Sequence, residues 1–194
     1  MFNSLKHPGV VAITLAAAGI LMVTNGIRLA NGLFLGPINT STGLGIASLS
    51  LAMAIGQFVW GAVQPVTGAL SDRFGPRPVL LGGVVLMALS TALTPFMSST
   101  LGLALTLGVL SAAGSGAASF SVLIGAAAQR MPAESRGTAS GVINAGGSFG
   151  QFVFAPIAQK LIQSLGWMGA MWTTALLTLA ALPLVGKLTA KTHA

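Results

Sequence analysis

Six long apolar stretches, separated by short polar links, occupy nearly the whole of this 194-residue chain. Each is long enough to cross roughly 30 Å of bilayer hydrocarbon, which takes about 20 apolar residues in a helix. The composition agrees, because 54% of the residues are hydrophobic and 6% are charged, against about 25% charged in soluble domains. We therefore expect an all-α, polytopic membrane protein, with a single six-helix transmembrane domain over 1–194 and spans at 9–35, 43–70, 78–97, 101–128, 137–163 and 167–187.

The basic residues lie in alternate links, which predicts how the chain is oriented. The net charge of +7 would indicate nucleic-acid binding in a soluble protein, but here the position of the charges decides against it. The opposite links, at 36–43, 98–100 and 163–166, carry no basic residue, with Lys160 about a turn away. By the positive-inside rule, both termini are expected on the cytoplasmic side. The residues that carry this pattern are Lys6, Arg73, Arg77, Arg130, Arg136, Lys187 and Lys191.

The link between the second and third stretches reads Gly68-Ala-Leu-Ser-Asp72-Arg73-Phe-Gly75-Pro-Arg77. Its spacing resembles the G-x-x-x-D-R-x-G-x-R signature between the second and third helices of the major facilitator superfamily. The glycine and proline layout at 32–37 and 64–65 is also similar to bacterial members related to monocarboxylate and oxalate carriers. The resemblance implies a transporter of the bacterial inner membrane.

The resemblance covers the whole chain but only half of the usual protein. Complete members have twelve spans in two six-helix halves, each an inverted 3+3 repeat, and hold substrate between the halves near the bilayer midplane. A faint internal echo, at 56–59 and 150–153, agrees with such a repeat. Three arrangements stay open: a homodimer of half-transporters, a half that pairs with a separate second half, and a fragment of a twelve-helix transporter. The two halves of a complete member have the same orientation in the membrane. A six-helix chain with both termini on one side can therefore pair with a second copy of itself in that orientation.

The 26 glycines include spacings that let helix backbones approach closely. Examples are 108–116 in the fourth stretch and 141–150 in the fifth, which is the densest cluster. Helices pack in lipid largely through such small residues, so close packing is the expected role of most of them.

Arg28 is the strongest candidate for a functional residue, because a guanidinium inside a span is costly unless it faces a cavity or a partner. Asn25 and Asn31 lie three residues on either side of it, so the three groups form a polar strip on one helix face. The alternative is that Arg28 snorkels into the headgroups. We favour the cavity, because the adjacent amides have no reason to face lipid. Further candidate cavity residues, which alternatively join helices through their amides, are Gln57, Asn144 and Gln151, with Gln64 and Ser148.

A guanidinium in a low-dielectric cavity pairs with carboxylate or phosphate through two parallel hydrogen bonds, so the expected substrate is a small organic anion. The only acids, Asp72 and Glu134, lie in the links, so no carboxylate is available to carry a proton through the spans. Anion exchange or facilitated uniport by alternating access therefore fits better than proton symport.

The charged link is expected to act as a conformational latch. Asp72 is placed to accept hydrogen bonds from the amino end of a helix in the opposite half, where the helix dipole favours an acid. In a homodimer, that helix is the sixth or the fifth span of the other copy, and the fifth is expected to begin near 136–137. The alternative for Arg73 and Arg77 is that they only signal topology. The proposed latch residues are Gly68, Asp72, Arg73, Gly75, Arg77 and Arg136.

No enzymatic constellation is present: the sequence contains no HExxH, no acid pair and no phosphate-binding GxxxxGK[ST]. We expect no enzyme activity, no cofactor, no metal and no nucleic-acid partner. The alternative hypothesis, from another functional class, is a membrane-embedded regulatory or assembly subunit that transports nothing.

Overall fold

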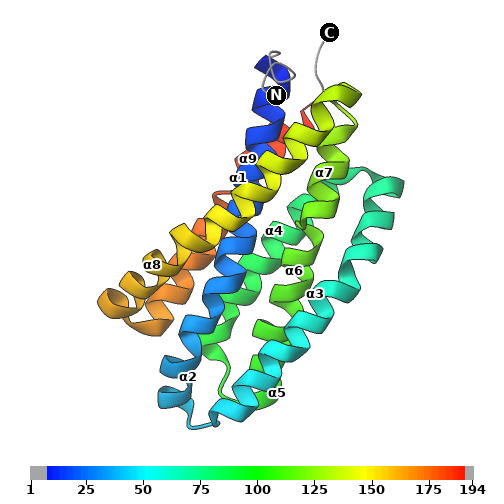
Figure 1. The fold of residues 1–194 in the computed structure, drawn as a ribbon. Helices are drawn as coiled ribbons and strands as arrows, with labels where there is room; N and C mark the ends of the chain where they lie inside the picture. The colour runs from blue at the N-terminus through cyan, green and yellow to red at the C-terminus, as the bar shows by residue number, and fades with distance from the viewer. Residues whose placement is uncertain (1–7, 191–194) are drawn as a thin grey trace.

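The computed structural model describes residues 8–190, and nearly all of them are helical (Figure 1). Within this range there is no β-strand. Five helical stretches are long and apolar enough to cross a membrane: Gly9–Thr42, Ile46–Phe74, Pro76–Phe96, Thr100–Ala128 and Ala133–Thr189. The predicted all-α, polytopic class is therefore confirmed. Lys6 and Lys191 lie outside the described residues.

The elements follow one another with very short connections. In chain order they are α1 Pro8–Ala30, the 3₁₀ turn η2 Asn31–Phe34, α2 Leu35–Thr42, α3 Ile46–Phe74, α4 Pro76–Leu93, the 3₁₀ turn η3 Thr94–Phe96, α5 Thr100–Leu103, the π-helix η4 Ala104–Leu110, α6 Ser111–Ala117, α7 Phe120–Ala128, α8 Ala133–Leu179 and α9 Leu182–Thr189.

The fifth stretch is long enough to cross a membrane twice. It has 57 residues, about 85 Å of helix at 1.5 Å per residue, against roughly 30 Å of hydrocarbon. Gly166 interrupts it with φ 70° and ψ 171°, a conformation that glycine adopts without steric penalty. Figure 1 shows the two arms of α8 folded back beside each other at this turn. The turn lies at the end of the predicted link 163–166.

The basic links lie at one end of the bundle. Figure 1 shows the start of α1, the end of α9 and the α3–α4 and α7–α8 connections at that end. The α2–α3 connection, α5 and the turn of α8 lie at the opposite end. Arg73 and Arg77 flank the α3–α4 connection, and Arg130 and Arg136 flank the α7–α8 connection.

The ends of several helices differ from the sequence-based boundaries. The first stretch continues through η2 and α2 to Thr42, which shortens its link to three residues around Gly43 and Gly45, both with positive φ. The α8 helix begins at Ala133, so Arg136 and Gly137 lie inside it and do not start it.

The fourth stretch is not one regular helix. It runs from α5 into the π-helix η4 and then α6, and a short break at Ala118 and Ser119 separates α6 from α7. Apolar periodicity does not report such irregularities. π-Helical turns within an α-helix are frequent at functional sites.

Glycine contacts hold several helices together, as two examples show. Gly26 of α1 faces α8, where a Cβ on Gly26 would lie 2.6 Å from the carbonyl oxygen of Gly150. Gly114 of α6 meets α4, where an added Cβ would lie 2.6 Å from the backbone nitrogen of Met87. Since lipid gives little hydrophobic drive between helices, such close backbone approach is what packs them. Two of the predicted glycine clusters therefore serve packing, although Gly141 has no atom within 4 Å of such a Cβ.

Candidate functional site

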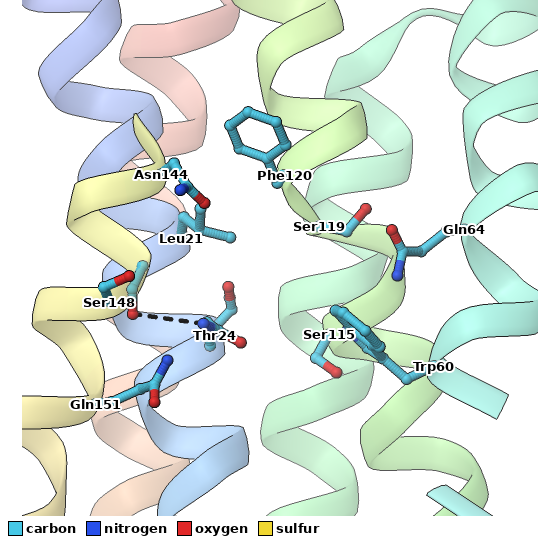
Figure 2. Close-up of a pocket in the computed structure, with 12 residues that line it drawn as sticks. Leu21, Thr24, Trp60, Gln64, Ser115, Ser119, Phe120, Asn144, Ser148 and Gln151 are labelled. Carbon is cyan, nitrogen blue, oxygen red and sulfur yellow. Dashed lines mark hydrogen bonds between the residues drawn. The ribbon is translucent and has the colours of Figure 1, made fainter. Parts of the chain in front are cut away.

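A polar cavity of about 360 Å³ opens in the middle of the bundle (Figure 2). Figure 2 shows α1 and α8 on one side of it and α3, α6 and α7 on the other. An Asn25 Nδ2 to Gly147 O hydrogen bond of 3.4 Å joins α1 to α8 beside it, drawn as a dashed line. The cavity is lined by Leu21, Thr24, Asn25, Trp60, Gln64, Ser115, Ser119, Phe120, Asn144, Gly147, Ser148 and Gln151.

The cavity lies at the mid-height of the membrane-length helices. Trp60 is the central residue of Ile46–Phe74, Asn25 is at the centre of Gly9–Thr42, and Ser115 is within a turn of the centre of Thr100–Ala128. Polar side chains at this depth are costly in lipid and therefore mark a water-filled or ligand-filled space. The neutral polar groups of the cavity suit hydrogen bonding to a polar solute.

Arg28 stands beside this cavity and is held by α3. Its Nη1 donates to Gln57 Oε1 at 2.7 Å, and its Nη2 donates to Asn25 Oδ1 at 3.5 Å. The guanidinium carbon lies 4.4 Å from the centroid of the Trp60 ring, a cation–π contact. The side chain is half-buried and reaches α3 through Gln57 and Trp60.

Within residues 8–190, the charge of Arg28 has no anionic partner. Gln57, Asn25 and Trp60 are all neutral, and the two acids of the chain lie near helix ends, Asp72 in the last turn of α3 and Glu134 in the first turn of α8. A desolvated cation without a counter-ion attracts an anion strongly, because the local dielectric constant is low. The arrangement therefore suits reversible binding of an anion.

The structure brings most of the predicted site residues together. Asn25, Asn144 and Gln151 line the cavity, and Gln57 binds Arg28 directly. Asn31 does not reach the cavity: it is buried and its Nδ2 donates to Ser111 Oγ of α6 at 3.5 Å.

Sequence reasoning missed part of the lining. Ser115 and Ser119, which were not among the candidate residues, are buried and also line the cavity. The break of the fourth stretch before α7 brings Phe120 to the same wall. The hydropathy of the fourth stretch does not mark the break, so the three-dimensional arrangement is what reveals these positions.

The charged link forms a tight turn at one end of the bundle. Gly75, with φ 85° and ψ 158°, ends α3 and precedes α4. Asp72 is exposed and lines an open groove along α3 with Gly68. Arg73 lies over the ring of Phe74 at 5.2 Å, and Arg77 is exposed in the first turn of α4. Arg136 is exposed near the start of α8, across the α7–α8 connection.

Arg130 acts differently from the other basic residues at this end. Its guanidinium donates to the backbone carbonyls of Leu188, Thr189 and Ala190, where α9 ends. These carbonyls have no partner within the helix, and a cation also complements the negative end of the helix dipole. Arg130 therefore caps α9 and ties it to the α7–α8 connection.

Nothing in residues 8–190 forms a metal site, since no group of three or more His, Asp or Glu side chains comes together there. The fold and the cavity instead define a class, that of multi-pass membrane transport proteins with a mid-span site. Residues 11–193 match the Major Facilitator Superfamily, and the chain belongs to that superfamily.

Several curated relatives carry the name of a small anion in their own names. The chain is 35% identical over 130 residues to monocarboxylate transporter 13 of Rattus norvegicus, covering 67% of this chain and 29% of that protein. It is 27% identical over 159 residues to the oxalate:formate antiporter of Oxalobacter formigenes, covering 81% and 37%. It is 29% identical over 133 residues to a probable sulfoacetate transporter of Cupriavidus necator, covering 69% and 30%. The chain thus spans about a third of the length of these relatives, which are transporters and not enzymes.

Proposed function

We propose that this chain forms one six-helix half of a carrier for a small organic anion, with Arg28 as the residue that binds the negative charge. The observation that carries the proposal is an arginine at mid-span, turned inward beside a cavity of about 360 Å³ and contacted by neutral groups. A carboxylate, or a sulfonate, matches the two Nη groups that now contact Gln57 and Asn25. The names of the relatives include monocarboxylate, oxalate, formate and sulfoacetate, all of this kind.

When an anion binds, it takes the place of the neutral groups that contact the Arg28 guanidinium. An anion entering the cavity passes Asn25 and Trp60 and replaces the neutral contacts of Arg28 with a charge-assisted pair. Asn144, Ser148 and Gln151 on α8 are then placed to hydrogen-bond the rest of the solute. Since the spans hold no carboxylate, the coupling that fits is exchange of one anion for another or facilitated uniport.

Transport proceeds by alternating access, in which this half rocks against a second six-helix half around the site. A second copy of the chain or a separate half supplies that second bundle. The exposed α3–α4 turn, with Asp72 and the flanking Arg73 and Arg77, is placed at one end of the bundle, where it acts as a latch against the opposite half. The basic connections at that end support an orientation with both termini in the cytoplasm, in the inner membrane of a bacterium.

Reconstitution tests the proposal. The purified chain is placed in liposomes preloaded with unlabelled oxalate, and entry of labelled oxalate, formate, lactate or sulfoacetate is followed, with the oligomeric mass measured by light scattering on the same sample. The expected result is a dimer that exchanges at least one of these anions, and no exchange by Arg28→Ala. A monomer without exchange would mean that a separate second half is needed. Equal exchange by wild type and Arg28→Ala refutes the role of Arg28. Absence of exchange for every anion, in a dimer of correct fold, refutes the self-paired carrier.

A further inference from the structure

Two buried polar atoms next to the proposed anion site have no hydrogen-bond partner. Among the side chains that the structure describes, these are Nε of Arg28 and Oδ1 of Asn31. The first is only a donor and the second is only an acceptor. A buried polar atom left unpaired costs about 1–3 kcal/mol, so two such atoms close in sequence on one helix require an explanation. Asn31 is 2% exposed, which excludes bulk water as its partner.

Both residues line a small, separate cavity between α1, α3, η4 and α6. Its volume is about 20 Å³, and its other lining residues are Met53, Gly56, Gln57, Leu107 and Ala112. A site needs a volume of at least about 10–15 Å³, open to the centre of a water-sized sphere, to hold one water molecule. The volume therefore admits one water and no organic anion. A metal ion is disfavoured, because the adjacent guanidinium is positive.

We propose that one ordered water occupies this cavity and bridges Arg28 to Asn31. The water accepts a hydrogen bond from Arg28 Nε–H and donates one to Asn31 Oδ1, so that each buried group gains the partner it lacks. Gln57 lines the same space, and its Oε1 accepts from Arg28 Nη1, which places a further acceptor at its edge. A buried water normally makes two to four such bonds.

The water makes Asn31 a positioning residue for Arg28. Asn31 is held from its other side by the 3.5 Å bond from Nδ2 to Ser111 Oγ, at the point where the π-helix η4 passes into α6. The bridged water then fixes the Nε edge of the guanidinium toward the inside of the bundle. The Nη groups are left for Gln57, Asn25 and an incoming anion. This consequence rests on the proposed function, whereas the water itself does not.

Nuclear magnetic resonance on protein labelled with ¹⁵Nε-arginine tests the water without any anion present. The chain has few arginines, and Arg28→Lys assigns the Arg28 signal by its loss. We expect a cross-relaxation peak between Arg28 Nε–H and water in the wild type, and its loss in Asn31→Leu, which removes the acceptor at similar volume. Ser111→Ala, which removes only the partner of the amide, is the matched control and keeps the peak. Asn31→Ala replaces Asn31→Leu if the latter does not fold.

Binding of labelled oxalate to the same variants tests the positioning role. We expect the dissociation constant to rise about tenfold in Asn31→Leu and to stay within twofold of wild type in Ser111→Ala. A wild-type protein without the water peak, or a peak that survives in Asn31→Leu, overturns the water site. A lost peak with unchanged oxalate affinity overturns the positioning role. If the wild type binds no anion, the proposed function fails while the water peak still reports on the water site.

Discussion

Replacing Gly26 with alanine is expected to push α1 and α8 apart. These two helices together form one side of the cavity. The added Cβ would lie 2.6 Å from the carbonyl oxygen and 2.7 Å from the carbonyl carbon of Gly150, and 2.7 Å from Cδ2 of Phe154. An ordinary contact is about 3.4–4 Å, so the helices must move apart by several tenths of an ångström or more. Two of the three neighbours are backbone atoms, which cannot rotate away as a side chain does.

Overpacking of this kind costs about 1–3 kcal/mol. For a chain of this size, each kcal/mol lowers the midpoint of thermal unfolding by about 2–4 °C, so Gly26→Ala is expected to lower it by about 2–12 °C. The midpoint is measured in detergent by tryptophan fluorescence, using the three native tryptophans.

Gly141→Ala is the matched control for this substitution. Gly141 lies in a helix, as Gly26 does, but a Cβ there has nothing within 4 Å. Alanine has a helix propensity about 1 kcal/mol better than glycine, so the control midpoint is expected to stay the same or rise. If Gly26→Ala is as stable as Gly141→Ala, the close contact between α1 and α8 is wrong.

Three further outcomes are expected. Because the chain has no cysteine, single cysteines report topology: in sealed, right-side-out vesicles an impermeant maleimide should label Ser41→Cys and not Gln129→Cys, and the reverse pattern contradicts the assigned orientation. Arg130→Gln should lower the unfolding midpoint by about 2–12 °C, because the carbonyls at the end of α9 lose charged donors worth about 1–3 kcal/mol together; an unchanged midpoint contradicts the cap. Gly75→Ala should also lower the midpoint, because φ 85° and ψ 158° cost a residue with a Cβ about 1–3 kcal/mol, whereas Gly82→Ala, in a helix with open space around it, should not.

The apolar stretches predicted the helical class. Their lengths identify membrane helices because the bilayer sets a minimum span, and Arg28 is conspicuous because a charge in a span is costly. Asn25, Asn144 and Gln151 were selected as polar groups within the spans, and the structure places all three on the wall of one cavity.

What the sequence did not predict depends on backbone irregularity and on contacts between distant helices. The π-helix η4 and the break before α7 leave no trace in hydropathy, yet the break brings Phe120 to the cavity wall. Asn31 shares a helix face with Arg28 by spacing, but the 3₁₀ turn η2 begins at Asn31, and its side chain turns to Ser111. The contact between Arg130 and α9 joins positions nearly 60 residues apart, beyond the reach of any local pattern.

Equilibrium binding of labelled anions tests the central claim, that Arg28 holds the negative charge of the substrate. Oxalate, formate, lactate and sulfoacetate are titrated by scintillation proximity against wild type, Arg28→Gln and Lys160→Gln, which also removes one positive charge but from an exposed site away from the cavity. The account predicts saturable binding of at least one anion by wild type and by Lys160→Gln, and a loss of about 100-fold or more in Arg28→Gln. Binding by Arg28→Gln as strong as by wild type would contradict it.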